Sequence, residues 1–328
     1  METKVKVEGV ARAIPASRLG VMTLGVNSVE EALNMSNLNW EVKKSTEPVR
    51  TTVLTNDGFE DISFPDKFIT YRQMPDQAPE ALGVVGKSYQ PIQNSEAFSF
   101  LNYLADDSGA TFSSAGSIRE GRQVFVNMKM PSSLKFIDGT DSVDMYLMVT
   151  TSHDGTKAFT AAVTPIRLAC TNQIRFALRS AKATFTLRHT KTSSGKIAEA
   201  HAALGLVHVY EDAFQTAVNE LIDSEMNKDQ YGKFIDVLMP DRFKNTGEQG
   251  GLTNAVETAK NDLINLWEAP TQKIAGQTRW AAYNAVAEYA DWFKPVRTNG
   301  DEQLVRAERI ITGQGEALKN RAYALLTR

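Results

Sequence analysis

Three cations have the spacing that a ligand-binding helix face requires, since Arg175, Arg179 and Lys182 follow one another at i, i+4 and i+7. If residues 172–182 form a helix, these side chains make one basic stripe along it. The apolar stripe of the same segment lies one position away, about 100° around the helix, and consists of Ile174, Leu178 and Ala181. We therefore expect an amphipathic helix that buries one face and presents three cations at its border, where they can bind phosphates.

The predicted basic stripe lies in a window that contains no acidic residue. Residues 155–198 hold eight Lys and Arg and no Asp or Glu, whereas the rest of the chain has 28 Lys and Arg against 39 Asp and Glu. A mildly acidic chain, with a formal net charge of −3, thus gathers positive charge in one segment. This pattern is typical of a site for a polyanion. The alternative is an ordinary helix face in contact with solvent.

A predicted strand over residues 122–130 contributes a second part of the same candidate site. Its alternation turns Val124 and Val126 toward the core and places Phe125 and Lys129 on the opposite face. An exposed aromatic ring beside cations is suited to stack on a nucleic-acid base. In the alternative interpretation, the helical C-terminal part covers Phe125. The candidate nucleic-acid-binding residues are Arg119, Arg122, Phe125, Lys129, Arg167, Arg175, Arg179, Lys182, Arg188 and Lys191.

Other chemistries find little support in the residue types. His201 and His208 share a helix face but lie seven residues apart, about 10.5 Å along the axis, so they cannot both ligate one metal ion from a straight helix. The run GVVGKS at residues 83–88 lacks the first glycine of a phosphate-binding P-loop. We therefore expect no catalytic residue set, no metal and no cofactor. A nuclease or hydrolase that uses His153, Asp154 or the His201/His208 face is the third alternative.

The composition limits the class of protein. The 328 residues are 42% hydrophobic and 23% charged, as in ordinary soluble globular proteins. The chain has no apolar run long enough to span a membrane and no signal-peptide core near its start. A single cysteine, Cys170, excludes an internal disulfide and fits a reducing compartment. We expect a cytoplasmic protein without a membrane partner.

The elements that would position the candidate residues form an antiparallel meander. Alternating apolar residues predict four strands in two hairpins, near residues 111–118, 122–130, 143–149 and 159–163. A helix from about residue 94 precedes them, and Asp154-Gly155 marks the turn of the second hairpin. From residue 196 onward almost everything is helical. We predict an α+β fold, with the meander and its packed helices in residues 1–195 and an all-helical region in residues 196–328.

Several blocks of the sequence resemble a phage/plasmid-like protein family of unknown function. The blocks are LGVVGKSYQPIQNSEAFSFLNYL, AGSIREGRQVFVNMKMP, LMVTTSHDGTKAFTAAVTPIRLACTNQIRFAL, LRHT, TRWAAYNAVAEYADWFKPVR and GEALKNRAYALL. Together they cover nearly the whole chain, although the N-terminus has SRLGVM where members of the family often have a Trp-His-Gly-Leu-Gly-type opening. The resemblance implies a protein of phages, prophages or plasmids of bacteria, and it implies no mechanism.

The order of the elements is similar, more remotely, to the core of phage single-strand annealing proteins. In those proteins the subunits form rings, and DNA lies in a basic groove between a meander and neighbouring helices. This similarity implies a homo-oligomer that binds and anneals single-stranded DNA without sequence preference, ATP or metal. The alternative is a protein-interaction module that targets a host factor or a host defence complex.

Overall fold

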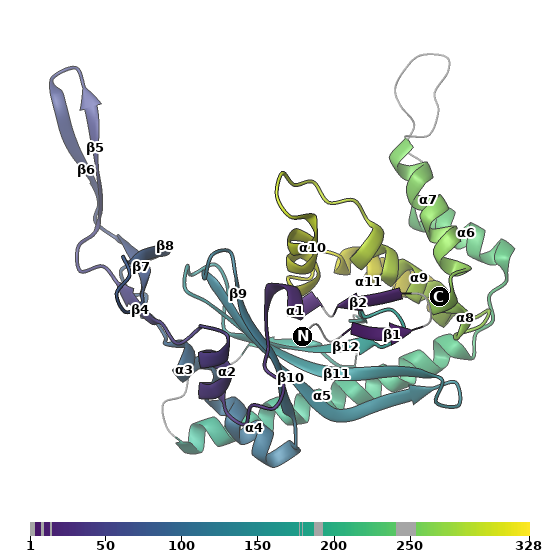
Figure 1. Ribbon diagram of the computed structural model, residues 1–328. Coiled ribbons are helices and arrows are strands. Elements are labelled where there is room, and N and C mark those ends of the chain that lie inside the picture. The colour runs from purple at the N-terminus through teal and green to yellow at the C-terminus, as the bar shows by residue number, and fades with distance from the viewer. Residues whose placement is uncertain are drawn as a thin grey trace.

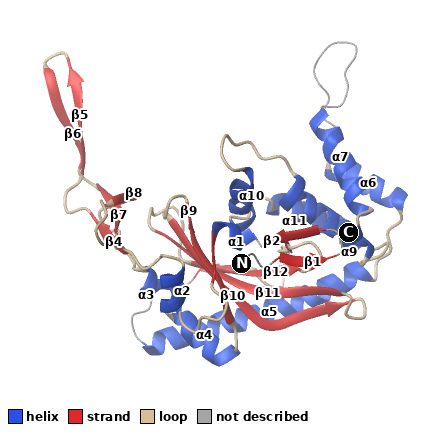
Figure 2. Cartoon of the chain, in the orientation of Figure 1, coloured by secondary structure: helices blue, strands red, loops and turns tan. Residues whose placement is uncertain are grey.

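The computed structural model describes residues 4–7, 10–13, 15–176, 178, 180–186, 193–240 and 254–328. Figures 1 and 2 show an antiparallel sheet with helices packed around it, followed by a C-terminal region that is mainly helical. This arrangement confirms the predicted α+β fold. No helix in the described ranges combines the length and apolar character that crossing a membrane requires.

A seven-stranded sheet forms the centre of the molecule. Its strands are β3 (Gly20–Met22), β9 (Thr111–Ile118), β10 (Gln123–Phe136), β11 (Asp141–Ser152), β12 (Thr160–Arg167), β13 (Asn172–Gln173) and β14 (Thr184–Thr186). They pair in the order β3-β9-β10-β11-β12-β13, and β14 also pairs with β12. The antiparallel hairpins β9–β10 and β11–β12 are confirmed. Gly121 and Gly155 take positive φ angles in their turns, and Arg119 and Glu120 do so as well in the first turn.

Helices surround the sheet and make up most of the C-terminal part. In chain order they are α1 (Pro15–Leu19), α2 (Val29–Met35), α3 (Asn94–Phe98), α4 (Phe100–Ser108), α5 (Ser193–Ile222), α6 (Lys228–Leu238), α7 (Asn254–Trp267), α8 (Pro270–Lys273), α9 (Arg279–Glu288), the π-helix η2 (Tyr289–Phe293), α10 (Glu302–Ile311) and α11 (Glu316–Leu326). α4 packs on α5, and α9 contacts α5, α7 and α11. The division at residues 195 and 196 stays a prediction, since one apolar core contains residues from both parts.

Both faces of the central sheet are buried. Val124 and Val126 point into the main core, which they share with residues of α4, α5 and α9. On the opposite face, Phe125 and Tyr146 pack with Ile311 of α10 in a smaller apolar cluster. The helical C-terminal part therefore covers Phe125, as the alternative interpretation of the sequence expected.

A smaller sheet carries a projecting hairpin. β4 (Glu41–Lys44), β7 (Lys67–Gln73) and β8 (Glu80–Gly86) pair in the order β4-β7-β8, while β5 (Val49–Thr55) and β6 (Gly58–Phe64) form a two-stranded sheet of their own. A further pair consists of β1 (Lys4–Val7) and β2 (Val10–Ala13). Gly58 takes a φ of 121° in the Asn56-Asp57-Gly58 turn between β5 and β6. Figure 1 shows this hairpin extending away from the body of the molecule.

The helix predicted over residues 172–182 does not form. Residues 172–173 belong to β13, and the described residues from 174 to 182 have no helical structure. Ile174 and Phe176 both join the main apolar core, whereas Arg175 between them reaches polar partners on β12 and α11, so successive side chains take different sides as in an extended strand. The N–H of Ile174 donates to the carbonyl of Pro165 at 2.8 Å, and the N–H of Phe176 donates to the hydroxyl of Tyr210 at 2.9 Å. Bonds to the sheet and to α5 thus satisfy the backbone in place of helical hydrogen bonds.

Candidate nucleic-acid interface

Arg167 is a structural residue and not a surface cation. It is fully buried, and its Nε donates to the carboxylate of Asp141 at 2.8 and 2.9 Å. Trp280 Nε1 donates to the same carboxylate at 2.8 Å, and Arg167 Nη1 donates to Gln272 Oε1 at 3.0 Å. These contacts join β11 and β12 to α8 and α9. The expectation that Arg167 contacts phosphates is corrected, because its guanidinium is shielded from solvent.

Arg175 is also held inside the protein. Its Nη1 donates to Glu316 Oε1 of α11 at 2.6 Å, and its Nη2 donates to Thr164 Oγ1 of β12 at 3.0 Å. Only 8% of the residue is exposed. Arg175 therefore ties the edge of the sheet to α11, and its predicted role as the first cation of a surface stripe is corrected.

Of the other two cations of the predicted basic stripe, the structure describes Lys182. Without a helix over residues 172–182, the i, i+4 and i+7 spacing no longer aligns the side chains. Lys182 is exposed. Arg179, Arg188 and Lys191 lie outside the described residues. The structure thus leaves Lys182 as the one described cation of the stripe that faces solvent.

Two predicted residues of β10 lie on the expected face of the strand but in different surroundings. Phe125 is 0% exposed and packs among Ile118 and Ile311, so it cannot stack on a base. Lys129 keeps 44% of its side chain exposed, and its Nζ pairs with Asp144 at 2.7 Å. A partner on the neighbouring strand therefore offsets its charge.

Two hairpin turns bring exposed cations together at one end of the central sheet. Arg119 and Arg122 lie in the β9–β10 turn, and Lys157 lies in the β11–β12 turn. The N–H of His153 donates to the carbonyl of Arg122 at 2.8 Å and links the two turns. Arg119 Nε lies 3.3 Å from Glu308 Oε1, which connects this end of the sheet to α10. The sequence predicts Arg119 and Arg122 as site residues, and the structure adds Lys157.

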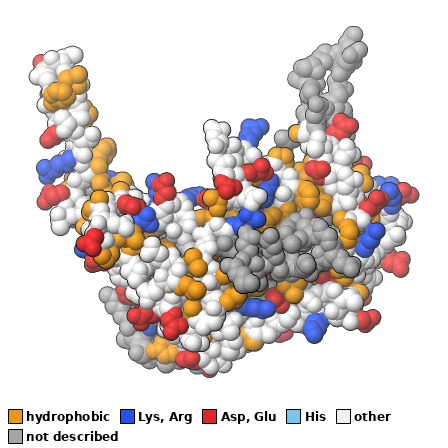
Figure 3. Space-filling model, in the orientation of Figure 1, with side chains coloured by type: hydrophobic (Ala, Val, Ile, Leu, Met, Phe, Trp, Pro, Cys, Tyr) orange, Lys and Arg blue, Asp and Glu red, His pale blue; other side chains and the backbone are white. Residues whose placement is uncertain are grey.

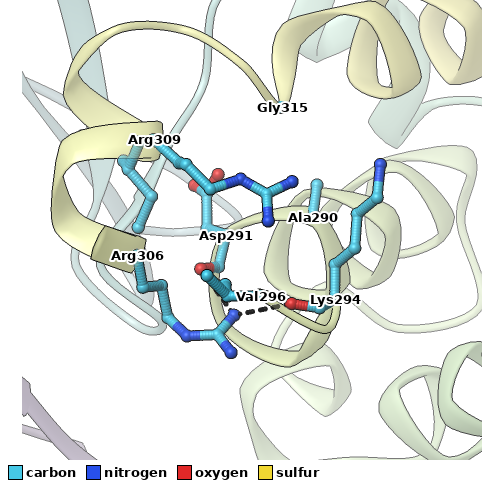
Figure 4. A pocket seen from close by; sticks show the side chains of 8 residues that line it. Ala290, Asp291, Lys294, Val296, Arg306, Arg309 and Gly315 are labelled. Carbon is cyan, nitrogen blue, oxygen red and sulfur yellow. Dashed lines mark hydrogen bonds between the residues drawn. The ribbon is translucent and has the colours of Figure 1, made fainter. Parts of the chain in front are cut away.

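A shallow pocket beside α10 supplies two further cations. Lys294, Arg306 and Arg309 are among the residues that line it. Arg306 Nη1 donates to the carbonyl of Lys294 at 2.9 Å and its Nη2 pairs with Glu302, so a carboxylate already offsets the charge of Arg306. Arg309 Nη1 donates to the carbonyl of Pro295 at 3.2 Å. Figure 4 shows the ammonium of Lys294 and the guanidinium of Arg309 with the Ala290 side chain between them. These two groups are the cations of the pocket that an added anion can approach.

Positive charge is crowded along these elements. Burial and then repulsion from Arg119 lower the pKa of Lys157. Burial and then repulsion from Arg309 lower the pKa of Lys294. A nearby anion would favour the charged form of both lysines. We call the set Arg119, Arg122, Lys157, Lys294 and Arg309 the cationic rim.

The surroundings of the cationic rim favour a polyanion over a single small ion. Glu120 lies 3.8 Å from Arg122, and Glu308 contacts Arg119, so acids offset only part of the charge. Phe293 precedes Lys294 in the chain and is 43% exposed, so part of an aromatic side chain stays in solvent close in sequence to these cations. Sequence patterns did not single out Phe293, Lys294 or Arg309. The first two lie at the end of η2, and Arg309 lies on α10, whose helical pattern does not report what the helix packs against.

Of the groups considered for catalysis, His153 is packed inside the protein, whereas His201 and His208 are exposed beside Asp107 and Glu211. His153 is buried, and its Nε2 lies 2.9 Å from Asn94 Oδ1. Burial lowers the pKa of His153 to about 4 and raises the pKa of the buried Cys170 thiol to about 12. Among the residues that the structure describes, no group of three or more His, Cys, Asp and Glu side chains is placed to hold a metal ion.

Comparisons with known proteins give one match. Residues 81–311, more than two thirds of the chain, match the family described as a domain of unknown function, DUF932. No curated protein and no solved structure matches the chain. The matched segment contains the whole cationic rim and excludes the β5–β6 hairpin.

Proposed function

Since the chain belongs to the DUF932 family, whose description assigns no activity, we propose from its surface that it binds single-stranded DNA without sequence preference along the cationic rim. The observation that carries the proposal is the placement of the rim: two hairpin turns, α10 and the segment after η2 bring five exposed or half-buried cations to one end of the central sheet. Cations that repel one another at an exposed edge are stabilised when a phosphate backbone lies between them.

The geometry of the rim fits a flexible single strand better than a duplex read in its grooves. The cations come from two turns, from α10 and from the segment after η2, so none forms a helix face or strand ribbon that enters a groove. Phe293 supplies a surface for base stacking, which tolerates any base. Phosphates are the same at every nucleotide and every base has a flat face, so contacts with either do not depend on the base sequence.

The proposal has three further parts. The protein anneals single strands, it forms an oligomer, and it is encoded by a phage or another mobile element. They rest on the resemblance of the sequence blocks and of the element order described above. In this proposal the protein acts in the cytoplasm of a bacterial host, as a homo-oligomer that holds single strands available for pairing and uses neither ATP nor metal.

The test is the salt dependence of binding to a labelled oligothymidine, followed by fluorescence anisotropy. If five phosphates are neutralised, the slope of log affinity against log salt is about −3.5, at roughly 0.7 per phosphate for single strands. A triple variant, Arg119→Gln, Lys157→Gln and Lys294→Gln, lowers the affinity at least about tenfold and flattens the slope by about 2.

Two matched substitutions locate the site. Lys228→Gln removes an exposed cation on α6, far from the rim in sequence, and leaves affinity unchanged. Lys182→Gln tests the position that the sequence favoured, and we expect little effect. Absent or salt-independent binding would refute nucleic-acid binding, and an equal loss in the triple variant and in Lys228→Gln would refute the rim.

A second candidate function is a protein-interaction module. It is favoured by the exposed apolar side chains of the β5–β6 hairpin, among them Leu54 and Phe59. Recovery of one host protein in a fixed ratio, lost in Phe59→Ser and free of nucleic acid, would support this alternative over DNA binding.

A further inference from the structure

The β5–β6 hairpin, residues 49–64, is here called the arm. It exposes four large apolar side chains within eleven residues: Leu54 at 74%, Phe59 at 78%, Ile62 at 47% and Phe64 at 54%. Leu54 and Phe59 pair across the strands at the tip, and Ile62 and Phe64 lie on the other face toward the base. The apolar surface therefore runs along the whole arm.

The arm lacks the packing that normally stabilises a hairpin. Two strands alone are marginally stable in water, and they need a third strand or a packed layer on one face. β5 and β6 pair with each other and with no other described strand, and Figure 3 shows the arm projecting with apolar groups on its surface. A partner that buries the tip would remove this exposed area from water.

The charge of the arm limits the nature of that partner. The arm contains the acids Asp57, Glu60 and Asp61 and one cation, Arg50, which lies at its base and pairs with Glu47. Two arms placed face to face would bring like charges together, which is unfavourable. The arm therefore fits an apolar surface that is bordered by cations.

The helical part of the chain offers such a surface. A groove of about 250 Å³ lies between α6, α11 and the start of α9, and we call it the helical groove. Its lining consists of Met226, Phe234, Val237, Leu325 and Leu326 together with the cations Lys233 and Arg279. No carboxylate lines it, and Val237 is 55% exposed. The groove has the apolar floor and positive border that the arm requires.

We propose that the arm of one copy of the protein docks in the helical groove of a second copy, with Leu54 and Phe59 on the apolar floor and Asp57 of the turn beside Lys233 and Arg279. Figure 1 shows the arm and the α6–α11 region at opposite ends of the molecule, so the arm cannot reach the groove of its own chain. Contacts between two different surfaces are head-to-tail, and they build rings or open filaments. The proposal is independent of nucleic-acid binding, because it uses neither the cationic rim nor any of its residues.

Sedimentation velocity without nucleic acid tests the proposal through two variants, one on each side of the contact. The wild-type chain should form species heavier than the 36.2 kDa monomer, increasingly so at higher concentration. Phe59→Ser removes the tip, and Val237→Asp places a carboxylate in the groove. Each variant alone should sediment as a monomer, whereas Leu24→Ser, an equally exposed apolar position outside both surfaces, should behave as the wild type.

Mixing the two variants distinguishes the head-to-tail contact from other arrangements. Phe59→Ser retains an intact groove and Val237→Asp retains an intact arm, so an equimolar mixture can form one contact and should double the sedimenting mass to that of a dimer. Thermal unfolding of each variant checks that it is folded. A wild-type monomer at all concentrations, a mixture that stays monomeric, or loss of assembly in Phe59→Ser alone would overturn the proposal, the last of these indicating contact between arms.

Discussion

At the scale of single residues, partners that are distant in sequence balance charges that look unopposed along the chain. Arg167 lies in the acid-free window, yet Asp141 neutralises it from a neighbouring strand. Arg175 meets Glu316, which follows it by 141 residues. A count of charges within residues 155–198 includes neither Asp141 nor Glu316, because both lie outside that range. Positive charge in a segment therefore predicts a surface site only for those cations that the fold leaves exposed.

Removing one partner of the buried Arg167–Asp141 pair should be costly. Asp141→Asn leaves the buried guanidinium without its counter-charge, so we expect the free energy of unfolding to fall by about 3–5 kcal/mol. Urea unfolding followed by circular dichroism measures the change. Glu268→Gln, at the exposed pair with Lys228, serves as the control and should leave the midpoint unchanged. Equal effects of the two substitutions would mean that the buried pair is not structural.

His153 should make stability depend on pH. Burial holds its pKa at about 4 in the folded protein, against 6.5 in the unfolded chain, so the folded state favours neutral imidazole. The stabilisation is present above pH 6.5 and is lost as pH falls from 6.5 to 4, by about 3 kcal/mol in all. Urea unfolding at several pH values should show this slope in the wild type and a shallower one in His153→Gln. Identical slopes would show that His153 is not responsible.

At the scale of elements, the sequence predicts a strand well where apolar and polar residues alternate over a long stretch and the neighbouring strands are antiparallel. The four predicted strands are found as β9 to β12, although β10, β11 and β12 extend beyond the apolar pattern and bulges shift the register of β10. Residues 172–182 fail because two periods fit the same short stretch. Ile174 and Leu178 match a helix, whereas Ile174 and Phe176 match a strand, and contacts with Pro165 and Tyr210 decide for the extended form. Tertiary hydrogen bonds of this kind leave no local signal in the sequence.

Tyr210 should therefore be needed to keep the segment after β13 extended. In Tyr210→Phe, the Phe176 N–H and C=O lose their hydroxyl partner inside the protein, and we expect a loss of about 1–3 kcal/mol in stability. The hydrogen-exchange rate of the Phe176 amide should rise by more than the loss in the free energy of unfolding alone would cause. Tyr103→Phe, at a half-buried tyrosine of α4, is the matched control. Unchanged protection at Phe176 would indicate another source of order.

The candidate site was predictable only in part for a related reason. Arg119 and Arg122 lie in a turn that the strand pattern defines, and both belong to the cationic rim. Lys294 and Arg309 join that rim only because α10 packs against the end of the sheet. No pattern within residues 289–311 reports that contact, so a site assembled from separate elements depends on the fold.

At the scale of the whole molecule, helices and the smaller apolar cluster cover both faces of the central sheet. A ligand therefore cannot bind across either face of this sheet. The exposed end of the sheet is the part of it that a ligand can reach. The arm and the helical groove lie elsewhere, so the proposed polyanion site and the two proposed docking surfaces do not overlap. Assembly would place successive rims along one path.

Assembly and binding should therefore be coupled through the length of the nucleic acid. A DNA strand long enough to reach the rims of two assembled subunits binds more tightly, because its second contact is intramolecular. We expect wild-type affinity to rise at least about tenfold from a strand that covers one rim to a strand that covers several. Phe59→Ser, which keeps an intact rim, should bind the short strand as the wild type does and lose most of that rise. Fluorescence anisotropy with oligothymidines of graded length measures both. The same length dependence in both proteins would mean that each subunit binds alone, even if the arm and groove do assemble the chain.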